Sequence, residues 1–185
     1  MKKFALIAAL LLAIATLALA QEMSNDKGKA NRPSPPASAK CAFSDGKTIK
    51  VDYSSPRAKG RKIFGEASED ALVPYGQIWR TGANEATTFV TDANVTVGGK
   101  AVPAGSYTLF TVPKADSWWL VISKETGEWG TKYSGEKQDV VRVPMKVSKN
   151  GPPVENLLIA FDQGGSACKL RVEWETTVAS VEIAK

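Results

Sequence analysis

The chain has 185 residues and a formal net charge of +5, from 24 basic and 19 acidic residues, and it contains no histidine. Basic and acidic residues are interspersed, without the long one-signed runs that neutralise phosphates, so nucleic acid is not expected as a partner. The lack of imidazole excludes histidine-dependent nucleophilic catalysis and histidine-ligated metal sites, and we expect neither a metal nor a cofactor.

Residues 1–20 have the features of an export signal. A lysine pair at positions 2 and 3 precedes an apolar run over residues 4–15, and Ala18-Leu19-Ala20 supplies the small residues that signal peptidase accepts. The run is shorter than the roughly 20 residues that a membrane-spanning helix needs. We therefore expect cleavage before Gln21, a periplasmic or secreted protein, and no stable membrane anchor after cleavage.

The rest of the chain suits a single domain preceded by a leader. Residues 21–40 are polar and contain prolines, which predicts a flexible leader, and residues 41–185 are expected to form one domain. Cys41 and Cys168 are too few and too far apart for a thiolate zinc site, and export would expose them to an oxidising compartment. We expect them to form one disulfide, the alternative being two buried thiols.

Alternation of apolar and polar residues dominates the domain. It is clearest over residues 49–53, 141–147, 169–175 and 179–183, with turn residues between the runs. Nine or ten short strands are expected, together with one short helix over residues 68–72 capped by Ser68. The predicted fold is all-β: a single antiparallel β-sandwich, jelly-roll-like, with a partly open β-barrel as the alternative.

One turn of the long irregular stretch from Ser54 to Glu85 concentrates recognition chemistry. Trp79 and Arg80 are followed closely by Asn84 and Glu85. An indole can serve as a stacking platform, and the polar groups can bind hydroxyls or an anion. These residues are our candidate ligand-binding site.

The same turn has a purely structural interpretation. Arg80 would pair with Glu85, Asn84 would bond to loop amides, Gly82 would adopt a positive φ, and Trp79 would fill the core. The residues alone favour this interpretation somewhat, so both remain open here.

A basic cluster lies earlier in the same stretch. Arg57, Lys59, Arg61 and Lys62 concentrate positive charge that could grip a carboxylate or phosphate, or could simply form a solvated loop. We add Arg61 to the candidate site.

Two further constellations have a functional and a structural interpretation. Trp118 and Trp119 point to opposite faces of an expected strand, so either one is an exposed platform or both faces are covered. Glu173 and Glu175 have the spacing of a paired-carboxylate site, but their face also carries basic residues, which favours a solvated charged stripe.

Several longer stretches resemble a bacterial exported family known as domain of unknown function 2911. The resemblance covers nearly the whole chain after the export signal, and its most specific part is residues 72–87. The other matching stretches are residues 59–65, residues 103–110 and Trp129-Gly130. The sequence departs from the family pattern at Ser123, where asparagine is usual, and at Ser55, where arginine is frequent. The resemblance implies an exported β-domain and supplies no activity.

Our functional hypothesis is a non-enzymatic exported binding module for a small polar or anionic ligand such as a saccharide or carboxylate. The alternative is a structural or protein-interaction domain of the cell envelope, with an envelope protein as its partner. A carboxylate-based hydrolase is the third hypothesis, and no nucleophile with a recognisable base supports it.

Overall fold

The computed structural model describes residues 28–185, so the predicted export signal lies outside the described residues. None of the helices in this part of the chain is long and apolar enough to cross a membrane. In chain order the elements are β1 (Pro36–Ala42), β2 (Thr48–Ser54), β3 (Phe64–Gly65), the 3₁₀ turn η1 (Ala67–Glu69), β4 (Val73–Pro74), β5 (Thr88–Thr91), β6 (Val95–Val97), β7 (Lys100–Val102), β8 (Gly105–Pro113), β9 (Trp118–Ser123), the 3₁₀ turn η2 (Glu136–Gln138), β10 (Asp139–Gly164) and β11 (Ala167–Ala184).

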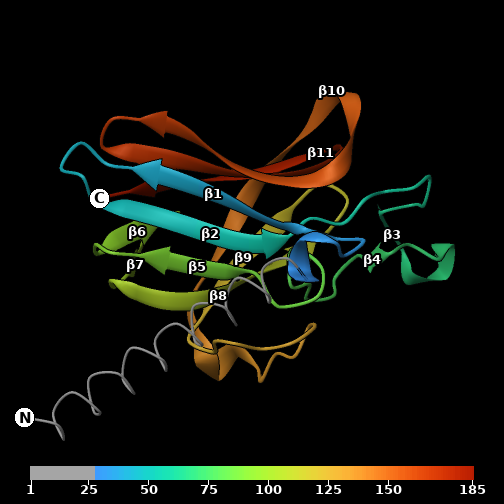
Figure 1. Ribbon diagram of the computed structural model, residues 1–185, viewed down its shortest axis with the longest axis horizontal. Coiled ribbons are helices and arrows are strands. Elements are labelled where there is room, and N and C mark those ends of the chain that lie inside the picture. Colours follow the sequence, from blue (N-terminus) through green and yellow to red (C-terminus); the bar gives the residue numbers. More distant parts are fainter. Residues whose placement is uncertain (1–27) are drawn as a thin grey trace, which may run out of the picture.

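One antiparallel sheet folds over to make both layers of the molecule. Its strands follow the order β1-β2-β5-β8-β9-β10-β11-β6-β7. Strand β10 belongs to both layers, because residues 139–145 pair with β9 and residues 146–164 pair with β11. Figure 1 shows β10 and β11 bending together on one side of the molecule. The predicted all-β, sandwich-like fold is confirmed, and within residues 28–185 the sheet ends at β1 and β7 without closing into a barrel.

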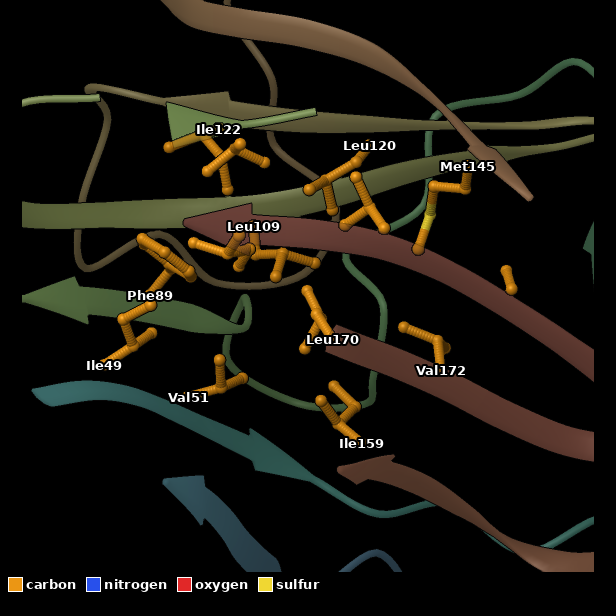
Figure 2. Close-up of a cluster of buried hydrophobic side chains, with 14 of the residues drawn as sticks. Ile49, Val51, Phe89, Leu109, Leu120, Ile122, Met145, Ile159, Leu170 and Val172 are labelled. Atoms are coloured by element: carbon orange, nitrogen blue, oxygen red, sulfur yellow. The ribbon is translucent and has the colours of Figure 1, made fainter. Parts of the chain in front are cut away.

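The core lies between the two layers and follows the period-two pattern of the strands. Figure 2 shows side chains from β2, β5, β8 and β9 meeting side chains from β10 and β11. Full burial of each large apolar side chain stabilises the fold by about 1.5–3 kcal/mol. The labelled core residues are Ile49, Val51, Phe89, Leu109, Leu120, Ile122, Met145, Ile159, Leu170 and Val172.

Strand β9 is covered on both faces along only part of its length. Val121 and Phe110, on the outer face, are fully buried, and Tyr133 packs edge-on against Phe110 with ring centroids 5.4 Å apart. Trp118 faces the core and is 2% exposed, whereas Trp119 is 38% exposed. Both faces of the strand are therefore covered at Val121 but not at Trp119, where the interpretation of two covered faces is wrong.

A disulfide joins Cys41 of β1 to Cys168 of β11, with 6.4 Å between their Cα atoms. It is the expected pairing, and it links the two layers covalently. The predicted leader boundary is wrong, however, because β1 begins at Pro36 and residues 36–40 pair with β2. Only small side chains, Ala37 and Ala39, pack against the core there, so the hydrophobic signal of the strand is weak.

Candidate ligand-binding cavity

The irregular segment between β2 and β5 folds across one end of the sandwich. It contains β3 and β4, which form a separate two-stranded parallel sheet. The short helix expected over residues 68–72 is instead the turn η1, which starts from Glu66 and not from Ser68. The Glu69 carboxylate accepts a hydrogen bond from the Glu66 amide at 2.7 Å and so closes this turn.

Trp79 anchors the segment to the sandwich. Its amide donates to the carbonyl of Thr111 at 2.8 Å, and the Thr111 amide donates back at 2.9 Å. The indole is 7% exposed and stacks on Trp174, with centroids 5.9 Å apart and planes 16° from parallel. Its Nε1 donates to the carbonyl of Gly82 at 3.2 Å. Trp79 therefore forms a wall between core and cavity, and it is not the open stacking platform of the functional hypothesis.

In the turn after Trp79, the residues with a positive φ are not the predicted Gly82. Thr81 and Asn84 adopt φ values of 54° and 56°, whereas Gly82 is not in the left-handed region. Gly82 is needed for space instead, because a Cβ there would lie 3.0 Å from the hydroxyl of Thr87 and 3.1 Å from the carbonyl of Ser54.

A cavity of about 760 Å³ opens against this turn. Its volume falls within the range of small-molecule sites. Trp79, Arg80 and Arg61 lie on its wall, and most of the remaining wall is apolar, with no carboxylate among the described residues that line it. The lining residues are Ser34, Pro56, Arg61, Leu72, Val73, Pro74, Gln77, Ile78, Trp79, Arg80, Gly82, Ala83, Thr131 and Trp174.

Arg80 carries a partly buried charge without an acidic partner among residues 28–185. Its Nη1 donates to the hydroxyl of Thr131 at 3.2 Å, while its Nε is buried and has no hydrogen-bond partner in the described part of the chain. Burial lowers the pKa of the Arg80 guanidinium, because desolvation disfavours the charged form. The predicted pairing of Arg80 with Glu85 does not occur.

Asn84 and Glu85 lie away from the cavity and hold the segment that precedes β1. Both carboxylate oxygens of Glu85 accept from Arg32 Nη1, at 2.8 and 2.9 Å. The Asn84 side-chain amide donates to the carbonyl of Ser34 at 3.1 Å. Burial alone would raise the pKa of Glu85, but the hydrogen bonds and charge of Arg32 outweigh it and lower the pKa. These two candidate site residues therefore position Ser34, which borders the cavity.

Arg61 is oriented by neighbouring carbonyls. Its Nε donates to the carbonyl of Ala58 at 3.0 Å, and its Nη2 donates to the carbonyl of Arg57 at 2.6 Å. Arg57 in turn donates from Nη1 to the carbonyl of Pro33 at 3.1 Å. Neutral acceptors fix these guanidinium groups in place, and neither group forms an ion pair within residues 28–185.

The arginines of the chain fall into two groups. Arg32, Arg142 and Arg171 each form an ion pair with a carboxylate. Those at or beside the cavity, namely Arg57, Arg61 and Arg80, contact only neutral acceptors within residues 28–185.

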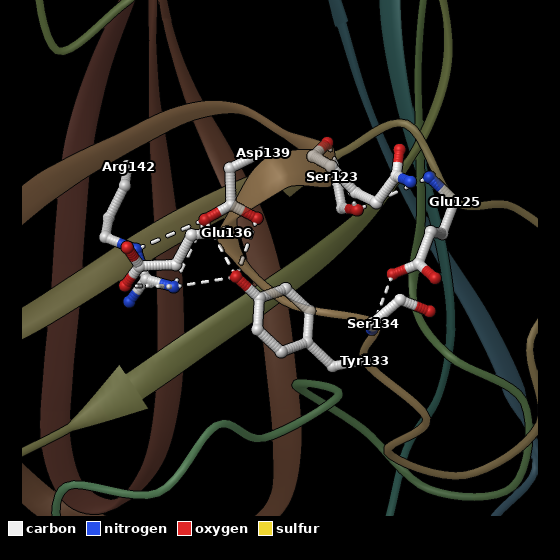
Figure 3. Close-up of polar contacts among 8 residues, drawn as sticks. Ser123, Glu125, Tyr133, Ser134, Glu136, Asp139 and Arg142 are labelled. Carbon is white, nitrogen blue, oxygen red and sulfur yellow. Dashed lines mark hydrogen bonds and ion pairs between the residues drawn. The ribbon is translucent and has the colours of Figure 1, made fainter.

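A polar network fixes the loop that brings Thr131 to the cavity (Figure 3). The Tyr133 hydroxyl donates to the Asp139 carboxylate at 2.9 Å, and Arg142 Nη2 donates to the Tyr133 hydroxyl at 2.9 Å. Arg142 also pairs with Asp139 at 3.1 Å. Burial and the hydrogen bond to Asp139 raise the pKa of Tyr133 to about 12. Nearby, the Glu125 carboxylate accepts from the backbone amide that follows Tyr133, at 3.0 Å.

The Glu173 and Glu175 pair contributes nothing to the cavity. Glu173 is buried and pairs with Arg171, so the solvated stripe expected there is wrong for this residue. Glu175 has a φ of 52°, which marks an irregularity in β11 and breaks the regular alternation of faces.

Comparison with protein families identifies the family of the chain. The family described as protein of unknown function (DUF2911) matches residues 34–183. The chain belongs to this family. Comparison with curated proteins and with solved structures finds no match.

The family match begins at Ser34 and includes every residue of the cavity wall. Sequence reasoning identified Trp79, Arg80 and Arg61 as site residues, but it missed Ser34, Thr131 and Trp174. Each of these comes from a segment remote in sequence, and no local pattern places it beside Arg80. A weak signal existed for Trp174, whose apolar position in an alternating strand predicted burial but not proximity to Trp79.

Proposed function

We propose that this protein is a non-enzymatic, exported binding module whose cavity holds a small anionic ligand with an apolar body. The observation that carries the proposal is the Arg80 guanidinium, which has no acidic partner among residues 28–185 and lies on the wall of a 760 Å³ cavity. A partly desolvated cation favours an anionic partner, and the planar guanidinium fork matches a carboxylate or phosphate.

The character of the wall narrows the class of ligand. Leu72, Val73 and Ile78 give the cavity an apolar surface, while Arg61 and Arg80 supply its charges. A saccharide fits less well, because the Trp79 ring is stacked on Trp174 and its Nε1 is satisfied. A carboxylate with an aliphatic or aromatic body combines the two properties of the wall.

Two observations support a binding role and export. The hydroxyls on the wall belong to Ser34 and Thr131, and no carboxylate base stands with them among the described lining residues. The Cys41–Cys168 disulfide is compatible with an oxidising compartment, and residues 1–20 resemble an export signal.

Calorimetry and thermal unfolding with hexanoate and benzoate, each compared with its neutral amide, test the proposal. At a concentration of 100 Kd the carboxylate should stabilise the protein by about 2.7 kcal/mol. For a domain of this size, that corresponds to a rise in Tm of roughly 5–10 °C. The amides should give a much smaller shift.

Matched variants locate the effect. Arg80→Met keeps most of the apolar stem but removes the charge, and it should abolish the preference for the carboxylate. Lys100→Met, at an exposed position of β7, should bind like the wild type. Equal shifts with carboxylates and amides, or undiminished carboxylate binding by Arg80→Met, would contradict the proposal.

An envelope interaction domain is the second candidate, because two indoles are exposed. Trp119 is 38% exposed and Trp129 is 63% exposed, although Arg32 lies over the Trp129 ring at 5.9 Å. A photo-crosslinker at position 119 should capture one envelope protein reproducibly if this surface binds a partner, and capture should fail at an exposed control position such as Lys100. Crosslinks of equal strength at both positions would count against this role.

A further inference from the structure

A second, basic depression adjoins the cavity. It has a volume of about 270 Å³ and is lined by Pro33, Ser34, Arg57, Lys59 and Arg61. Because Ser34 and Arg61 also line the cavity, the two hollows meet at these residues. We name the side chains of Arg57, Lys59 and Arg61 the basic shelf.

The basic shelf carries an excess of positive charge. All three of its long side chains are cationic, and no carboxylate lines the depression among the described residues. An acidic group beside the shelf is Glu155, whose carboxylate accepts from the backbone amide of Lys59 at 2.9 Å. One neighbouring carboxylate leaves three cations only partly compensated.

The two arginines of the basic shelf, and the backbone of Lys59, are also preorganised. Carbonyl groups hold the guanidinium groups of Arg57 and Arg61, as described above, and use only some of the five N–H donors of each. Lys59 adopts a left-handed φ of 51°, which is uncommon outside glycine, and Glu155 fixes this conformation through the amide. Groups held in place before binding lose little freedom when a ligand arrives.

We propose that the ligand is elongated and carries two anionic groups, one bound by Arg80 in the cavity and the other by the basic shelf. The apolar side chains of the cavity wall would contact the body between the two groups. This inference rests on the proposed function and adds to it the ligand class: an α,ω-dianion with carboxylate or phosphate ends and an apolar linker.

The test compares ligands that differ only in the second charge. Calorimetry measures α,ω-dicarboxylates of rising chain length against monocarboxylates with the same number of carbons. One length of dicarboxylate should bind on the order of tenfold more tightly than its monocarboxylate, a gain of about 1.4 kcal/mol. This gain should shrink at high salt, since the shelf is exposed. Replacing one carboxylate end with a phosphonate shows which anion the shelf prefers.

Variants assign the second charge to the basic shelf. Lys59→Gln, and separately Arg57→Gln, should lower the affinity for the dicarboxylate and leave that for the monocarboxylate unchanged. Because Arg57 also holds Pro33, Lys59→Gln is the cleaner variant: within residues 28–185 only the backbone amide of Lys59 is hydrogen-bonded. Lys62→Gln is the matched control on the same loop, since Lys62 pairs with Glu69 at 2.5 Å and lies outside the basic shelf.

The outcomes separate this inference from the proposed function. If monocarboxylates and dicarboxylates bind equally well through Arg80, and Lys59→Gln changes neither affinity, the second site is wrong and the proposed function stands. If neither ligand binds, both proposals fail. If Lys62→Gln weakens dicarboxylate binding as much as Lys59→Gln does, the gain reflects general charge attraction and the assignment to the basic shelf is overturned.

Discussion

Replacing Arg80 should cost the fold almost nothing, whereas the same replacement at Arg142 should destabilise it clearly. Arg142→Met removes the cation paired with Asp139, whose side chain is only 8% exposed. Asp139 keeps the hydrogen bond from Tyr133 but loses its counter-charge. Leaving a buried, charged acceptor incompletely satisfied costs about 1–3 kcal/mol.

At Arg80 the two contributions oppose each other. Arg80→Met loses the hydrogen bond from Nη1 to Thr131, worth about 0.5–1.5 kcal/mol, and removes a buried Nε with no partner, which relieves about 1–3 kcal/mol. The methionine side chain retains most of the packing of the stem. The free energy of unfolding of the variant should therefore lie between about 0.5 kcal/mol below and about 2.5 kcal/mol above that of the wild type.

Urea unfolding with the disulfide intact measures both variants, and an unchanged m-value would show that the denatured state is comparable. Thermal unfolding should separate the two by about 2–4 °C per kcal/mol for a domain of this size. Equal losses of stability would refute the reasoning, because Arg80 would then be a structural residue and its cavity a by-product of packing.

Three further predictions concern the rest of the molecule. Reduction of the disulfide should lower the free energy of unfolding by about 4–5 kcal/mol, since the bridge spans 127 residues. The double replacement Cys41→Ser with Cys168→Ser should have the same effect, and that variant should no longer respond to reductant. The pKa of Tyr133 rises from 10.0 to about 12 on folding, so its contribution to stability is complete below pH 10 and is lost as the pH rises toward 12. Tyr133→Phe should therefore reduce the fall in the free energy of unfolding between pH 10 and 12, which urea unfolding at each pH measures. The lowered pKa of Glu85 means that its contribution to stability is present above pH 4.5 and is lost as the pH falls further. Because Glu85 holds Arg32, Glu85→Gln should make residues 28–35 more sensitive to limited proteolysis at pH 7, without changing the rest of the digestion pattern.

The sequence predicts the architecture well wherever one strand face is buried. Alternation over residues 49–53 and 169–175 places Ile49, Val51, Leu170 and Val172 in the core, as the structure has them. It predicts β1 poorly, because alanines alternate there and give almost no hydrophobic contrast.

The site was only partly predictable, for reasons of distance along the chain. Local patterns identified Arg80 as an unusual cation, but its counter-charge is a question about the whole fold. Glu85, five residues away, was the obvious partner, and it pairs instead with Arg32. Whether a charge is neutralised depends on which loops the topology brings together, and no spacing rule contains that information.

Strand β10 has a mechanical consequence for the sandwich. It is continuous through both halves of the molecule, and on the other side the bond between Cys41 and Cys168 joins the halves again. Separating the two layers would require breaking a strand or a covalent bond, so the distance between the layers is effectively fixed. The shape of the cavity at the end of the sandwich therefore depends on the two stretches that bring Arg61 and Ser34 to its wall, and not on any separation of the layers.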